Sequence, residues 1–171
     1  MAGFSKIVLF MSCKEHDDLD VYVMLRKLSV DGEVMEQSNI PLHELPSDHK
    51  SVKDVYNVTP CKYLGPLGML RASHREIDPE KSSEYWPWHP HKRVQLVPRG
   101  DVVELQIGIW PCGIVFEKGE GLRVNISGRD MRLPEWDNPH VAGMEPQFNQ
   151  GRHNVHLGGK YKQSYLVIPK V

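Results

Sequence analysis

The chain has 171 residues, enough for one domain that buries roughly 70% of the surface exposed by its unfolded form, so a core can form without disulfides. Its 21 basic and 22 acidic residues nearly cancel, which argues against nucleic-acid binding. Three cysteines without a close pair favour neither a disulfide framework nor a zinc site, and no apolar run reaches membrane-spanning length. Composition therefore predicts a cytoplasmic domain that binds neither nucleic acid nor membrane.

The N-terminal part of the chain predicts a meander of antiparallel strands. Lys6–Ser12 is apolar on both faces, which is typical of a strand inside a sheet that is covered on both sides. Apolar and polar residues alternate over Leu19–Arg26, which predicts a second strand. Asp31-Gly32 then predicts a hairpin turn, with residues 33–38 as its return arm.

The middle of the chain is less regular. Residues 39–62 contain several prolines and predict a long connection with one helical turn near Pro41–Leu45. Alternation over Met69–Ile77 predicts a strand. Residues 78–91, DPEKSSEYWPWHPH, are polar, aromatic and interrupted by proline, which predicts an exposed loop. A short strand is expected at Val94–Val97.

The clearest strand patterns lie in the second half. Val103–Ile109 and Leu122–Ser127 each alternate apolar and polar residues, and Trp110-Pro111 is expected to end the first of them. After a long loop over residues 129–151, two segments at 154–157 and 164–168 are expected to pair and close the domain. These patterns predict an all-β fold, an antiparallel β-sandwich of the jelly-roll, galactose-binding-domain-like type, as one domain over residues 1–171.

Tryptophans and histidines in the two long loops are the candidate contact residues for a substrate or partner. Exposed tryptophans are costly and often mark binding sites. The candidates are Trp86, Trp88, His89, His91 and Trp136. His89 and His91 could also form a metal clip, but a packed loop end is the favoured interpretation.

Other chemical groups favour structural interpretations. His153 and His156 are three residues apart in an expected strand, so their rings should point to opposite faces. The acidic turn around Asp18 lacks the spacing of a calcium loop, and Cys112 has no base near it in sequence. Ser73 and His74 are neighbours on an expected strand and should face opposite ways. The sequence predicts no catalytic residue, no metal site and no cofactor.

Several motifs recur here in the order of one known family. They are the strand, acidic turn and hairpin of residues 3–31, LRASHRE at 70–76, WHPH at 88–91, the I-W-P and F-x-K-G elements within 98–127, H-x-x-H-x-G-G at 153–159 and LVIP at 166–169. The chain resembles the C-terminal β-sandwich domain of the X-Pro dipeptidyl-peptidase and cocaine-esterase (CocE/NonD) group of serine hydrolases. The resemblance covers nearly the whole chain.

The resemblance implies an accessory role. In that family the serine, aspartate and histidine of the triad lie in a preceding α/β-hydrolase domain, and the sandwich helps to wall the substrate cleft. This chain contains no G-x-S-x-G nucleophile motif. We therefore expect a non-catalytic domain whose partner is an α/β-hydrolase domain, with an apolar patch where that domain would pack, or a homo-oligomer that covers the patch. The alternative is a free-standing jelly-roll module that binds a carbohydrate or another ligand through Trp86, Trp88 and Trp136.

Overall fold

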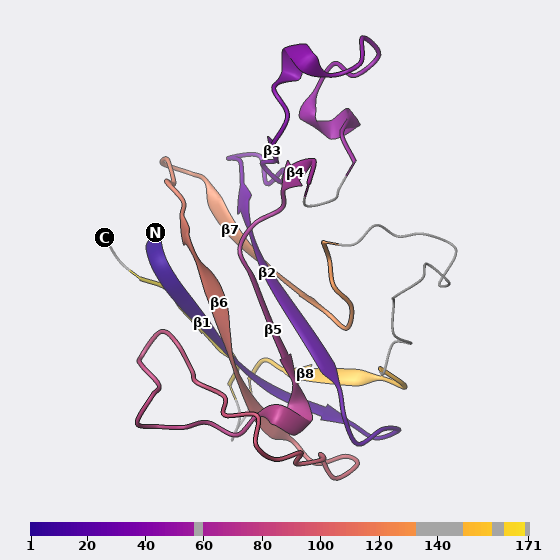
Figure 1. Cartoon of the computed structure of the whole chain (residues 1–171), viewed down its shortest axis with the longest axis vertical. Helices are drawn as coiled ribbons and strands as arrows, with labels where there is room; N and C mark the ends of the chain where they lie inside the picture. The colour runs from indigo at the N-terminus through magenta and orange to yellow at the C-terminus, as the bar shows by residue number, and fades with distance from the viewer. Residues whose placement is uncertain (57–59, 133–148, 159–162, 170–171) are drawn as a thin grey trace.

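The computed structural model describes residues 1–56, 60–132, 149–158 and 163–169 (Figure 1). Its regular elements are antiparallel strands and short 3-10 helices, and no helix within these ranges has the length and hydrophobicity needed to cross a membrane. The strands are β1 (Ala2–Cys13), β2 (Asp20–Leu28), β3 (Gln37–Ser38), β4 (Lys62–Tyr63), β5 (Leu67–Arg71), β6 (Val103–Gly113), β7 (Gly121–Ser127), β8 (His153–His156) and β9 (Tyr165–Val167). The 3-10 helices are η1 (Leu42–Glu44), η2 (Val52–Asp54) and η3 (Ala72–His74).

The first sheet is built around β1. On one edge β6 pairs with β1 along nearly its whole length, with Ile7 opposite Ile107. On the other edge β8 pairs with residues 10–13 and β9 with residues 6–8, so these short strands follow one another along β1. The predicted central strand is confirmed, because β1 has neighbours on both edges and buries side chains of both faces in its middle.

The second sheet has β2 at its centre, between β5 and β7. Val23 lies opposite Gly68 of β5 on one side and opposite Ile126 of β7 on the other. β3 and β4 form a separate two-stranded ribbon, which extends with η1 and η2 beyond one end of the two sheets (Figure 1). The helical turn predicted near Pro41–Leu45 is confirmed as η1.

The hydrophobic core lies between the two sheets. Alternate side chains of β1, β2 and β6 enter it, as the period of two in their sequences requires. Its buried members are Ile7, Leu9, Met11, Cys13, Leu19, Val21, Val23, Leu25, Leu70, Ala72, Val97, Leu105, Ile107 and Ile109. Burial of one large apolar side chain contributes about 1.5–3 kcal/mol, so apolar contact is what holds the sheets together. The predicted all-β antiparallel sandwich is confirmed.

β5 and β6 approach each other closely at one side of the sandwich. A Cβ atom on Gly68 would lie 2.5 Å from the carbonyl oxygen of Gly108, closer than a real Cβ atom can come. The obstacle is backbone and cannot rotate away, so glycine is required at position 68. Glycine at this position therefore allows β6 to lie directly against the second sheet.

The strand predicted over Met69–Ile77 is wrong in its second half. β5 ends at Arg71, and η3 follows at once. The Asp18 carboxylate accepts a hydrogen bond from the Ser73 amide at 2.9 Å, and the Ala72 amide donates to Leu19 at 2.8 Å. These bonds to the β1–β2 connection turn the backbone out of the sheet where the sequence still alternates.

The predicted end of a strand at Trp110-Pro111 is also wrong, because β6 continues to Gly113. Within the described ranges β6 pairs with β1 on one edge. Proline has no N–H to donate, so it is tolerated in a strand that has a free edge. The register between β1 and β6 shifts between Gly3 and Ser5, beside this proline.

Three other pairings differ from the prediction. The turn at Gly32 is present, with φ of 80°, but the return arm forms only a bridge from Val34 to Leu28 before β3 pairs with β4. Residues 94–97 form no strand, although the Val97 amide donates to Asp17 at 2.7 Å. The last two predicted strands form, but each pairs with β1 instead of the other.

Candidate functional site

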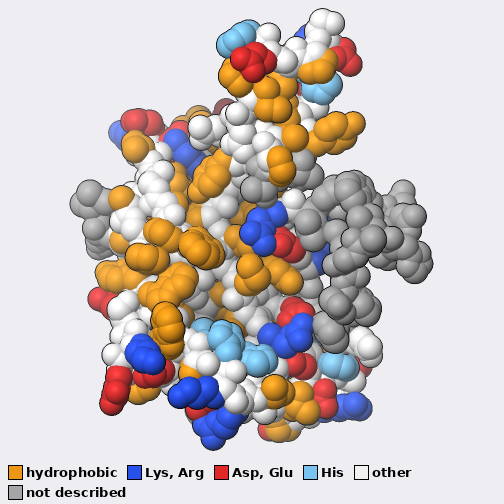
Figure 2. Space-filling model, in the orientation of Figure 1, with side chains coloured by type: hydrophobic (Ala, Val, Ile, Leu, Met, Phe, Trp, Pro, Cys, Tyr) orange, Lys and Arg blue, Asp and Glu red, His pale blue; other side chains and the backbone are white. Residues whose placement is uncertain are grey.

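An aromatic patch lies on the outer face of the first sheet. The ring of Trp86 meets the ring of Phe4 edge to face, with centroids 5.1 Å apart, and its centroid lies 6.4 Å from that of Trp110. Phe4 is 45% exposed and Trp110 is 64% exposed. We call Phe4, Trp86 and Trp110 the aromatic patch. Figure 2 shows hydrophobic side chains gathered over β6 on this side of the molecule.

The strand geometry explains why the patch forms. Side chains of β6 alternate between the core and the outer face, so Trp110 and the bare backbone of Gly108 face outward on one side of β6. The Trp86 ring lies against Gly108 so closely that a Cβ atom there would come within 2.8 Å of it. Glycine at position 108 therefore allows the indole from residues 78–97 to pack on the sheet.

His89 fastens this loop to the sheet. Its Nδ1 lies 2.9 Å from the carbonyl oxygen of Glu76, and its Nε2 lies 2.9 Å from the carbonyl oxygen of Gln106 on β6. A neutral imidazole has one N–H and can donate to one carbonyl, whereas an imidazolium donates to both. His89 is therefore placed to hold the loop beside Trp86, with each ring nitrogen facing a carbonyl oxygen.

His91 lies beside a second group of polar residues. Its ring centroid is 5.2 Å from that of His74 and 6.0 Å from that of His89. His74 and His91 line a cavity of about 430 Å³ on the outer face of the second sheet, together with Asp20, Tyr22 and other residues of β2 and β5. Desolvation of the ring, and then the charges of His74 and His89, lower the pKa of His91.

Charge is already neutralised within this cavity. Arg71 donates two hydrogen bonds to the Asp20 carboxylate, at 2.7 and 2.9 Å. Burial, followed by the negative charge of Asp20, raises the pKa of Tyr22, so this hydroxyl stays protonated near neutral pH. The cavity therefore presents paired charges and a phenol, with no free carboxylate or nucleophile from these residues.

The pKa of His91 provides a direct test of this histidine group. His74→Gln removes a neighbouring positive charge, so it is expected to raise the pKa of His91 toward the ordinary 6.5. A lowered histidine pKa favours the neutral ring in the folded state, so the associated stability is present above pH 6.5 and is lost as pH falls through the lowered value. NMR titration of the ring protons measures the shift, and a His153→Gln variant serves as the distant control. A His91 pKa at or above 6.5 in the unsubstituted chain would contradict the arrangement.

Trp88, another predicted contact residue, is not among the aromatic rings in contact at the patch. Trp88 is 46% exposed, and the Lys81 ammonium lies 5.9 Å from the centre of its ring. Trp136 lies outside the described residues. The structure thus brings Trp86 into an aromatic group, uses His89 as a tether, places His91 beside a cavity and leaves Trp88 apart.

Phe4 and Trp110 were missed by sequence reasoning. Trp110 was interpreted as the end of a strand, and Phe4 precedes the apolar run that predicted β1. The alternation of β6 from Glu104 to Trp110 was the available signal, because it places Trp110 on the exposed face. Their contact with Trp86 depends on pairing between distant strands.

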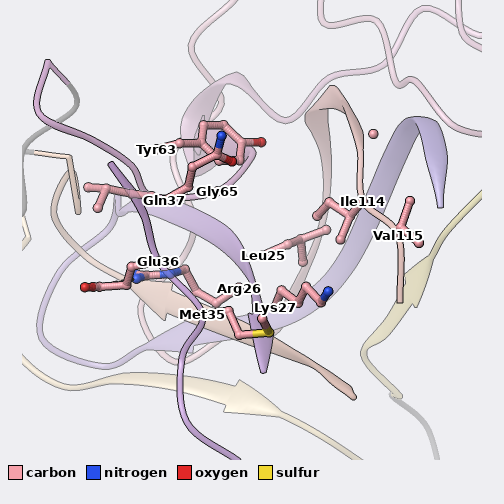
Figure 3. Close-up of a pocket in the computed structure, with 12 residues that line it drawn as sticks. Leu25, Arg26, Lys27, Met35, Glu36, Gln37, Tyr63, Gly65, Ile114 and Val115 are labelled. Carbon is pink, nitrogen blue, oxygen red and sulfur yellow. Dashed lines mark hydrogen bonds and ion pairs between the residues drawn. The ribbon is translucent and has the colours of Figure 1, made fainter. Parts of the chain in front are cut away.

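A further cavity, of about 310 Å³, lies between the end of β2, residues 35–37 and the segment that follows β6 (Figure 3). Leu25 and Ile114 give it apolar walls, and Arg26 and Glu36 line it with charge. Glu36 pairs with Arg26 at 3.3 Å and with the ammonium of Lys62 at 2.7 Å. Lys62 is 1% exposed, so its pair with Glu36 is buried, and the contact of Glu36 with Arg26 joins the β3–β4 ribbon to β2.

The remaining candidates have structural partners. The Ser12 hydroxyl lies 3.0 Å from Nε2 of His156, whereas Nε2 of His153 lies 3.1 Å from the Gln150 carbonyl oxygen. Burial raises the pKa of the Cys112 thiol, which leaves little thiolate at neutral pH. Across the described ranges, no group of three or more His, Cys, Asp or Glu side chains could hold a metal ion.

The predicted separation of Ser73 and His74 has a different cause from the one expected. Both lie in η3 instead of a strand. The Ser73 hydroxyl and Nδ1 of His74 are buried, and neither has a hydrogen-bond partner among the described residues. A serine nucleophile needs a hydrogen-bonded base, so these two residues do not form a catalytic pair.

Comparison with known proteins identifies the family. A family model described as the X-Pro dipeptidyl-peptidase C-terminal non-catalytic domain matches residues 1–167. Two crystal structures of a CocE/NonD family hydrolase from Staphylococcus aureus are similar to this chain, with TM-scores of 0.73 and 0.72 and 29% sequence identity in each. No curated protein matches the chain in a sequence comparison.

The extent of these matches defines what is shared. They cover 100% and 99% of this chain but 28% of the hydrolase chain in each structure, so this chain spans just over a quarter of the length of those hydrolases. The sandwich described above is therefore the shared part. The chain belongs to the family of X-Pro dipeptidyl-peptidase C-terminal non-catalytic domains.

Proposed function

We propose that this chain works as the accessory C-terminal domain of a CocE/NonD-type serine hydrolase. In this role it packs on an α/β-hydrolase domain and forms part of the wall of the substrate cleft. The observation that carries the proposal is the match of residues 1–167 to a family of non-catalytic domains. The sequence supports it, because a nucleophile elbow of the G-x-S-x-G type is absent from these 171 residues.

The chemistry proposed for the whole enzyme is hydrolysis of an ester, an amide or a proline-containing peptide. The attack on the acyl carbon belongs to the α/β-hydrolase domain. This chain would contribute rigid apolar surface that positions the substrate and excludes water, which lowers the barrier without a reacting group. Its three cysteines are unpaired thiols, which suits work in the reducing cytoplasm.

The purified chain is therefore expected to hydrolyse neither p-nitrophenyl esters nor X-Pro p-nitroanilides above the rate of a heat-denatured sample. Release of nitrophenol or nitroaniline is followed by absorbance. The chain is used at a concentration high enough for a single turnover per molecule to be detected. A His153→Ala, His156→Ala variant tests whether any residual turnover depends on the two histidines of the H-x-x-H motif.

Turnover that persisted in that variant and vanished on denaturation would contradict the proposal. A glycan array tests the alternative role, a free-standing module that binds a carbohydrate. Binding that is specific for one glycan and is lost in Trp88→Ala would favour a free-standing module instead.

A further inference from the structure

We infer that the aromatic patch is the surface on which the catalytic domain of the same hydrolase docks. The inference rests on the proposed function and names the contact surface that this function requires. Phe4 and Trp110 leave 45% and 64% of their surface exposed although each touches Trp86. Large aromatic side chains that are exposed together usually mark a contact surface.

The backbone that carries the patch is held in place by paired strands and by a loop fastened to the sheet. Phe4 belongs to β1 and Trp110 to β6, and these strands pair along nearly their whole length. Trp86 is held against Gly108 by the loop that His89 fastens to the Gln106 carbonyl oxygen. Preformed aromatic anchors lose little conformational entropy on docking, so they contribute more to affinity than mobile side chains do.

The position of β1 indicates which partner covers the patch. In a C-terminal domain, the preceding part of the polypeptide enters at the first strand. Met1 directly precedes β1, and its amine and carbonyl both bond to Ile114, at 2.9 Å each, so the start of β1 is held beside the end of β6. Ile114 directly follows β6, the strand that carries Trp110. A catalytic domain joined at this point would lie at the strand ends that carry Phe4 and Trp110.

The similar hydrolases contain enough additional chain to cover it. This chain corresponds to 28% of the Staphylococcus aureus hydrolase, so most of that polypeptide lies outside the shared sandwich. A second copy of this chain could also cover an apolar surface, but it would have to compete with a domain tethered beside it at high effective concentration. The geometry therefore favours the catalytic domain as the occupant.

Co-expression tests the inference. A tagged 171-residue chain is produced with the Staphylococcus aureus hydrolase shortened to remove the segment that matches this chain, and the tag is used to capture the shortened hydrolase. The hydrolase's own matching segment serves as the positive control. The patch variants are Phe4→Ser and Trp110→Ser. Their matched controls are Val94→Ser and Leu96→Ser, which change apolar side chains that are 64% and 53% exposed outside the patch.

We expect the unsubstituted chain and both controls to capture the hydrolase, and each patch variant to capture on the order of tenfold less. Circular dichroism verifies that every variant is folded. Equal capture by patch and control variants would overturn the docking surface while leaving the proposed function intact. No capture by the unsubstituted chain would contradict the proposed function itself. Sedimentation of the chain alone measures whether it forms a dimer. A dimer that is lost in Trp110→Ser would assign the patch to a second copy of the chain and would also overturn the inference.

Discussion

Glu36→Ala is expected to lower the free energy of unfolding by about 3 kcal/mol. The Glu36 carboxylate lies 2.7 Å from the ammonium of Lys62, and only 1% of the Lys62 surface reaches solvent. Removal of the carboxylate leaves a buried positive charge without its acidic partner, and it also takes away the partner of Arg26. The lower end of the usual range is expected because Lys62 makes a further interaction. Urea denaturation followed by circular dichroism measures the change.

The double variant Glu36→Leu, Lys62→Met is the matched control. It replaces both charges by apolar side chains of similar size but still removes the Glu36 carboxylate from Arg26, so it is expected to be destabilised by about 1 kcal/mol, clearly less than Glu36→Ala. Because the pair anchors the β3–β4 ribbon, Glu36→Ala should also increase hydrogen exchange at the Gln37 amide. If the single and double variants were equally destabilised, the loss would come from packing and the importance of the ion pair would be refuted.

Trp86→Ala is expected to lower the free energy of unfolding by about 2 kcal/mol. The value lies below that of a fully buried tryptophan because the indole is only partly covered, by Phe4, Gly108 and Trp110. Its removal leaves the bare backbone at Gly108 open to water and takes away the centre of the aromatic patch. Thermal and urea unfolding measure the effect on stability.

Trp88→Ala provides the comparison, since it changes the same residue type two positions away. Trp88 is 46% exposed, and its backbone amide keeps its bond to the Ser82 hydroxyl in the variant. It is expected to change stability by less than about 0.5 kcal/mol. Similar losses in the two variants would show that the loop is stabilised by its tryptophans in general, and not by the contact of Trp86 with the sheet.

Local sequence patterns predicted the strands but not all of their partners. The apolar run at Lys6–Ser12 correctly predicted a central strand, because burial of both faces needs no knowledge of the neighbours. The alternation over Met69–Ile77 gave a wrong prediction from Ala72 onward. There the pattern continues, but the Asp18 carboxylate accepts a hydrogen bond from the Ser73 amide and the backbone leaves the sheet. A hydrogen bond between residues so far apart in the chain leaves no periodic trace, so it could not be predicted from spacing.

The candidate site was predicted only in part for a similar reason. An exposed loop with tryptophans was expected at residues 78–91, and the structure describes it as a loop. The aromatic patch, however, combines Trp86 with side chains from β1 and β6. Its existence depends on the register that places Gly108 opposite Lys6 and on the missing side chain at position 108. Neither feature is visible without the pairing of the strands.

The two short strands that follow one another along β1 have a consequence for how the domain is made. β1 is synthesised first, yet its free edge is covered by β8 and β9, and the Phe10 amide bonds to the Ser164 hydroxyl 154 positions later. Pairings between such distant segments form slowly. Until they form, a strand that is apolar on both faces has an open edge available to other chains. Pairing of β8 and β9 with β1 is therefore the step that closes this edge to other chains.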